Sequence, residues 1–119
     1  GPTLILADRI QLHAVIHNLL INAADALEPV PFARQDLRIA MRREDSLAVL
    51  IVEDSGPGVA QDIRENIFEG LTTTKKHGLG LGLSICRSIV RAHGGTIALQ
   101  DSTLGGARFV VTLPLIQKG

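Results

Sequence analysis

The chain has 119 residues, which fits one compact domain, and its 45% hydrophobic but only 3% aromatic content predicts an aliphatic core. Its formal net charge is zero, which argues against a nucleic-acid partner, and no apolar run approaches the roughly 20 residues that span a bilayer. The single cysteine, Cys86, excludes an internal disulfide and fits a reducing cytoplasm, so we expect a cytoplasmic domain without direct membrane insertion.

The first predicted element is a long helix. Residues 1–2 are typical of a scar left by tag removal, which places the domain itself at residues 3–119. Asp8 is a candidate N-cap, and the helix should run to about Leu27, before Pro29 opens a loop. Apolar side chains at helical spacing form its expected core face: Leu12, Ile16, Leu19, Leu20, Ala23 and Leu27.

Strand patterns follow. From Leu37 apolar residues alternate with polar ones, and Leu47 to Val52 is almost continuously apolar, as in a buried central strand. These two segments are expected to form a hairpin. Two last strands are predicted near Thr96–Gln100 and Ala107–Leu113, and Pro114 should end the sheet.

Between the strand pairs, a short helix is expected around Gln61 to Phe68, and the polar stretch Thr72 to His77 should be a loop. The glycine-rich run Gly78 to Gly82 then opens a second long helix, Leu83 to His93, whose core face is predicted to include Ile85, Cys86, Ile89 and Val90. Gly94-Gly95 should stop it. This order predicts an α/β fold, a two-layer sandwich with helices on one face of a mixed or antiparallel sheet.

Three polar residues line up on the first helix. Asn18 and Asn22 are four apart and share a face, and Asp25 lies three beyond Asn22. Asparagine is unfavourable inside a helix, so two aligned ones need a reason. A carboxamide oxygen can ligate Mg²⁺ without adding charge. The spacing alone leaves a polar helix edge and a metal site equally open.

Asp54 comes directly after the buried strand and is followed by Gly56 and Gly58. A carboxylate there can accept a hydrogen bond from an exocyclic amine, and glycines let a flat ring approach the backbone. Composition alone favours an ordinary turn. Likewise, the threonines and lysine of residues 72–75 could meet phosphates, but their composition favours a solvated loop.

Gly78, Gly80 and Gly82 alternate at the start of a helix, where exposed N–H groups and the helix dipole favour phosphate. The run is not a P-loop, because it lacks the Gly-Lys-Ser/Thr ending. Nor is it the dinucleotide fingerprint, because a polar loop rather than a strand precedes it and the third glycine is misplaced.

Together these segments resemble the N, G1, F and G2 boxes of the ATPase domain of bacterial sensor histidine kinases. That superfamily includes gyrase B, the MutL repair ATPases and the ninety-kilodalton heat-shock chaperones. The resemblance runs from Asp8 to Leu113, and Phe68 through Gly82 is similar to the nitrogen-regulation and oxygen-sensing subfamily. It implies the Bergerat ATP-binding fold, here lacking its first strand before Thr3.

The resemblance implies a protein-histidine kinase domain that binds ATP and Mg²⁺ and donates the γ-phosphate to a histidine. The acceptor would lie on the protein's own dimerisation domain, which then serves a response regulator. None of the chain's four histidines is followed by the acidic residue and proline of the acceptor motif, so this domain should be inactive alone. A degenerate nucleotide-binding regulatory module and an anti-sigma-type serine kinase remain as alternatives.

By resemblance, Asn22 is the Mg²⁺ ligand and Asp54 accepts from the adenine amino group. Asn18 and Lys75 are the expected catalytic residues. Hydrolysing relatives usually carry a glutamate base at the Asn18 position; an amide cannot take that proton, so ATP would be stored rather than hydrolysed. Many relatives have threonine where Ala107 stands. The expected nucleotide-binding residues are Asn18, Asn22, Asp25, Asp54, Gly56, Gly58, Thr73, Thr74, Lys75, Gly78, Leu79, Gly80, Leu81, Gly82 and Leu83.

Overall fold

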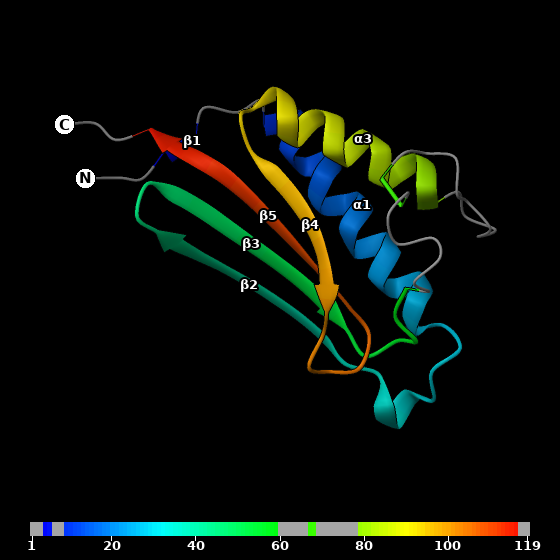
Figure 1. The fold of residues 1–119 in the computed structure, drawn as a ribbon. Coiled ribbons are helices and arrows are strands. Elements are labelled where there is room, and N and C mark those ends of the chain that lie inside the picture. Colours follow the sequence, from blue (N-terminus) through cyan, green and yellow to red (C-terminus); the bar gives the residue numbers. More distant parts are fainter. Residues whose placement is uncertain (1–3, 6–8, 60–66, 69–78, 117–119) are drawn as a thin grey trace.

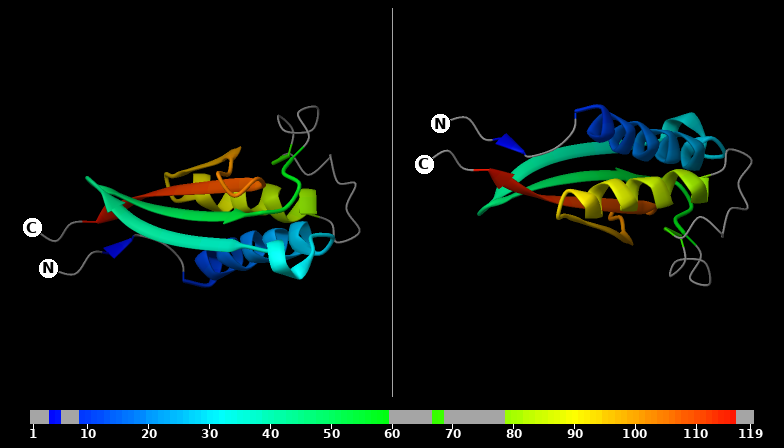
Figure 2. Two further views of the ribbon diagram at one scale, coloured as in Figure 1. Left: turned by 90° about the horizontal axis from the view of Figure 1, so that it is seen from below. Right: turned by 90° about the horizontal axis from the view of Figure 1, so that it is seen from above.

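The computed structural model describes residues 4–5, 9–59, 67–68 and 79–116. Two long helices lie side by side on one face of a twisted sheet, and the other face carries no helix within these ranges (Figures 1 and 2). The α/β two-layer prediction is therefore confirmed. In chain order the elements are β1 (Leu4–Ile5), α1 (Arg9–Leu27), the 3₁₀ turn η1 (Phe32–Arg34), β2 (Leu37–Glu44), β3 (Leu47–Asp54), α3 (Leu79–Ala92), β4 (Thr96–Asp101) and β5 (Ala107–Ile116). No helix in the described part of the chain is long and apolar enough to cross a membrane.

The sheet is antiparallel at every described pairing, so the mixed alternative is wrong for these strands. The order is β2-β3-β5, and the far edge of β5 pairs with β4 along most of its length and with β1 near its end. The β2–β3 and β4–β5 hairpins meet at β5, which runs antiparallel to all its neighbours. Glu53 on β3 stands opposite Arg108 on β5, a register that matters for the site.

Pro114 does not end the sheet. It lies inside β5, opposite Leu47, and the next residue, Leu115, donates its N–H to the Ser46 carbonyl at 2.8 Å. Because successive N–H groups of a strand point to opposite sides, the missing N–H of Pro114 faces the other edge of β5. There β4 pairing begins at Thr112 and β1 pairing only at Leu115, so Pro114 removes no ladder bond.

Helix α3 begins four residues earlier than predicted, at Leu79, so most of the glycine run forms its first turn. A glycine in a helix costs about 1 kcal/mol relative to alanine, a cost that burial of Leu83, Cys86 and Val90 on the same helix offsets. The predicted stop is confirmed: Gly94 has φ 78°, and the Gly95 N–H bonds the Val90 carbonyl at 2.9 Å.

The core lies between the helices and the sheet. It differs in part from the predicted faces: Ile85 is 45% exposed, and Ile16 is only half-buried. Phe109, 1% exposed, sits at the centre of an otherwise aliphatic core and meets the Phe68 ring edge-on at 6.1 Å. The buried cluster comprises Val15, Leu19, Ala23, Val52, Leu83, Cys86, Val90, Ala107, Phe109, Val111 and Leu113.

Candidate functional site

The Asp54 carboxylate is the most deeply buried charged group at the carboxyl end of β3, with 1% of the residue exposed. One oxygen, Oδ1, accepts the Gly56 N–H at 2.8 Å and the Ala107 N–H at 3.4 Å. Burial raises the pKa of Asp54, the two N–H bonds lower it, and the charge of Glu53 raises it again. The result is a buried acceptor held in place by two backbone N–H groups, one from the turn after β3 and one from the first residue of β5.

Two glycines let the backbone close around this carboxylate. A Cβ on Gly56 would lie 2.7 Å from the Ala26 carbonyl oxygen of α1. A Cβ on Gly106 would collide with Asp54 Oδ1 and would lie 2.5 Å from the Asp54 carbonyl oxygen. Gly58 has φ 78°, a left-handed conformation that other residues rarely adopt. The predicted site included Gly56 and Gly58 but not Gly106.

The last turns of α1 reach this region. Asn22 is buried, with 8% exposed, and Ala26, four residues further along the same helix face, is the residue that Gly56 packs against. Asn18 and Asp25 are half-buried. The structure therefore brings the asparagine helix and the Asp54 turn together, as the sequence predicted for one site.

The Asn18 side chain contacts α3 through Cys86. Burial raises the pKa of the Cys86 thiol to about 11, and a hydrogen bond from the Asn18 side chain lowers it. The thiol donates to the Val15 carbonyl at 3.7 Å. Cys86 is fully buried and protonated at neutral pH, which confirms its predicted place on the core face of the second helix.

The remaining predicted residues are only partly described. Thr73, Thr74, Lys75 and Gly78 lie outside the described residues, as does most of the predicted short helix before them. Residues 79–82 form the start of α3, and Leu83 is buried against the core. The N-terminus of α3 is at the same end of the molecule as the C-terminus of α1 (Figure 1).

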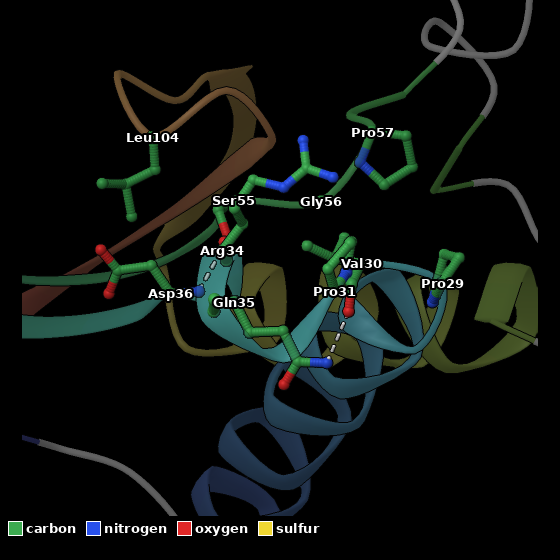
Figure 3. Close-up of a pocket in the computed structure, with 11 residues that line it drawn as sticks. Pro29, Val30, Pro31, Arg34, Gln35, Asp36, Ser55, Gly56, Pro57 and Leu104 are labelled. Atoms are coloured by element: carbon green, nitrogen blue, oxygen red, sulfur yellow. Dashed lines mark hydrogen bonds between the residues drawn. The ribbon is translucent and has the colours of Figure 1, made fainter.

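A cleft of about 750 Å³ opens beside the Asp54 turn and was not predicted. It is lined by residues from segment 29–36, by Ser55, Gly56 and Pro57, and by Leu104 (Figure 3). The Ser55 hydroxyl donates to the Arg34 carbonyl at 2.8 Å and accepts the Asp36 N–H at 2.7 Å. These bonds tie the segment after α1 to the turn that follows Asp54. Of the predicted site residues that the structure describes, Gly56 is the one that lines the cleft.

A buried carboxylate beside glycines, facing an asparagine-bearing helix on a two-layer α/β scaffold, defines a class of nucleotide-binding domain. Residues 7–117 match the family model described as histidine kinase-, DNA gyrase B-, and HSP90-like ATPase. The chain belongs to this family, and the relatives it matches are sensor histidine kinases.

The chain is 38% identical over 113 residues to the C4-dicarboxylate transport sensor protein DctS of Rhodobacter capsulatus, and the match covers 95% of this chain and 17% of DctS. It is 40% identical over 115 residues to the sensor protein FixL of Bradyrhizobium diazoefficiens, covering 96% of this chain and 22% of FixL. Among solved structures, the nucleotide-free catalytic domain of histidine kinase ThkA superposes with a TM-score of 0.80 at 34% identity, covering 92% of this chain and 70% of that one. The chain thus spans only about a fifth of the length of these two curated relatives.

Proposed function

We propose that this chain binds Mg-ATP and donates the γ-phosphate to a histidine on a separate dimerisation domain of its own protein. The phosphate would then pass to a response regulator in the cytoplasm. The observation that carries the proposal is Asp54: a buried carboxylate held by the Gly56 and Ala107 N–H groups, with Gly106 packed so closely that a Cβ there would collide with Oδ1. A fixed carboxylate beside glycine backbone suits a flat base whose exocyclic amine needs an acceptor.

The donor set on α1 fits Mg²⁺. The carboxamide oxygens of Asn18 and Asn22 are hard, uncharged ligands, and Mg²⁺ is usually held by one or two protein oxygens together with phosphates and waters. Asn22 would hold the ion, which neutralises phosphate charge when bound. Lys75, with Thr73 or Thr74, would contact phosphate. Because Asn18 is an amide, no base stands at its position to activate water, and ATP would be kept for transfer.

Asn22→Ala tests the metal role. We expect about a tenfold loss of affinity for a non-hydrolysable ATP analogue when Mg²⁺ is present, and little loss in EDTA. Alanine is the better helix former, so the fold should not suffer. Calorimetric titration in the two buffers measures the difference, with the exposed His13→Ala of the same helix as the matched control. An equal loss with and without Mg²⁺ would count against metal ligation.

Transfer itself is tested by mixing the chain with an acceptor-helix domain from a sensor kinase relative and with ATP labelled on the γ-phosphate. The proposal expects acid-labile, alkali-stable label on the acceptor histidine, and no label on this chain alone. A chain that binds ATP yet never labels a competent acceptor would be a regulatory nucleotide-binding module. Acid-stable label on a serine would instead indicate a serine kinase.

A further inference from the structure

Asp54 has a neighbour, Glu53, that is buried on the opposite face of the sheet. Val52 belongs to the core beneath the helices, so Asp54 faces the helices and Glu53 faces away from them. Although that face carries no helix in the described part of the chain, Glu53 is only 4% exposed. Its hydrogen-bond partner on that side is Ser102, in the connection from β4 to β5, residues 102–106, whose backbone is drawn in Figure 1.

Ser102 joins this connection to Glu53. Its hydroxyl donates to Glu53 Oε1 at 2.8 Å and accepts the Leu104 N–H at 2.9 Å. The Arg38 and Arg108 guanidinium groups are further from the carboxylate, at 3.9 Å and 3.8 Å, so they balance its charge without a short hydrogen bond. Ser102 is itself buried, with 8% exposed. The serine is thus the short, directional contact between β3 and the connection.

The same connection touches Asp54 from the other face. The Ser102 N–H donates to the Gly106 carbonyl at 2.9 Å, which closes the turn. Gly106 then lies flush against Asp54, and the next residue, Ala107, donates its N–H to Asp54 Oδ1. The turn therefore contacts the end of β3 on both faces: Ser102 bonds Glu53, and Gly106 and Ala107 contact Asp54.

We propose that Ser102 and Glu53 are positioning residues for base recognition: they hold the β4–β5 turn so that Gly106 and the Ala107 N–H fix the Asp54 carboxylate. The inference rests on the proposed function and assigns Ser102 and Glu53 no direct contact with the nucleotide. Hydrogen-bond strength falls steeply as geometry departs from ideal. If the turn lost its bond to Glu53, the Asp54 carboxylate would be less well fixed, and the hydrogen bond to the adenine amine would weaken more than the contacts to the phosphates.

Ser102→Ala is the test, with affinities for matched non-hydrolysable ATP and GTP analogues measured by calorimetry in Mg²⁺. We expect the affinity for the adenine analogue to fall about tenfold and the affinity for the guanine analogue to change little. The ratio of the two affinities, which is the preference for adenine, should therefore fall about tenfold. Ser102→Thr keeps the hydroxyl and should restore the preference. Ser46→Ala, in the β2–β3 turn at the far end of the sheet, is the matched control and should bind as the wild type does.

The outcomes separate the two proposals. If Ser102→Ala binds both analogues like the wild type, or lowers only the unfolding temperature, the positioning role is wrong. If the wild type binds neither analogue, the proposed function fails, and the inference fails with it. If Ser102→Ala does not fold, Ser102→Cys is the second test, because it keeps the side-chain packing and has a weaker hydrogen-bond donor. The preference for adenine over guanine should then fall by a smaller factor. An unchanged preference in that variant overturns the positioning role.

Discussion

Asp54→Asn is expected to reduce affinity for a non-hydrolysable ATP analogue by about 100-fold, equivalent to ~2.7 kcal/mol. The asparagine oxygen would keep the bonds from the Gly56 and Ala107 N–H groups, since both reach a single carboxylate oxygen. The amide nitrogen would then present a donor where the adenine amine needs an acceptor. A buried site built around one hydrogen bond discriminates strongly against the wrong polarity.

The same variant should keep its fold. Burial raises the pKa of Asp54 above its unfolded value, so the ionised carboxylate weakens the folded state at neutral pH. Stability from a group with a raised pKa is present below the unfolded pKa and is lost as pH rises through the folded pKa. Asparagine carries no such charge, so the free energy of unfolding of Asp54→Asn at neutral pH should equal or exceed that of the wild type. This difference in the free energy of unfolding should disappear in acid, where the wild-type carboxyl is protonated.

Calorimetry and chemical denaturation across pH measure these two effects separately. The matched control is Asp45→Asn, an exposed substitution in the β2–β3 turn, where φ is 55° and asparagine is equally suited. The control should alter neither quantity. Near-normal titration of the analogue by Asp54→Asn would remove Asp54 from the proposed site.

Gly106→Ala is the second large expected effect. The added methyl group would collide with Asp54 Oδ1 and with the backbone of β3, so either the turn or the carboxylate must move. We expect a loss of about 1–3 kcal/mol in the free energy of unfolding and at least a tenfold loss of analogue affinity. Denaturation and calorimetry on the same preparation give both values.

Gly105→Ala separates collision from backbone strain. Gly105 has φ 105°, but no described atom lies within 4 Å of the position that a Cβ would take, so alanine there strains the turn without touching Asp54. It should lose stability while keeping most of its nucleotide affinity. If Gly105→Ala and Gly106→Ala impair binding equally, the turn matters only as a folding unit, and the contact with Asp54 does not.

Helices and strands whose bounds depend on the local sequence pattern could be predicted. Helix α1 ends at Leu27 as expected, and the β2–β3 hairpin follows from an alternating run beside an almost continuously apolar one. The predictions that failed, for Pro114 and Ile85, depend on the elements that pack beside each residue. Whether Pro114 breaks a strand depends on which edge its missing N–H faces, and the exposure of Ile85 depends on which sides of α3 the sheet and α1 cover. Neither can be read from one segment alone.

The site shows the same division. Composition alone favoured an ordinary turn after Asp54, and its site role was expected from the resemblance of the four segments taken together; the structure packs Gly56 of this turn against Ala26 of the asparagine helix. Gly106, Ser102 and the role of Glu53 were missed, because a turn some 50 residues away meets Asp54 only through the β3–β5 register. One signal was available in the sequence: two acidic residues, Glu53 and Asp54, end an apolar strand.

Whether this chain holds Mg-ATP at the Asp54 end of its sheet is decided by calorimetric titration of the wild-type chain with a non-hydrolysable ATP analogue, with and without Mg²⁺. We predict saturable binding at one site, tightened by Mg²⁺ and weakened about 100-fold in Asp54→Asn. A titration that shows no binding in either buffer, or equal binding by wild type and Asp54→Asn, would contradict the proposed site.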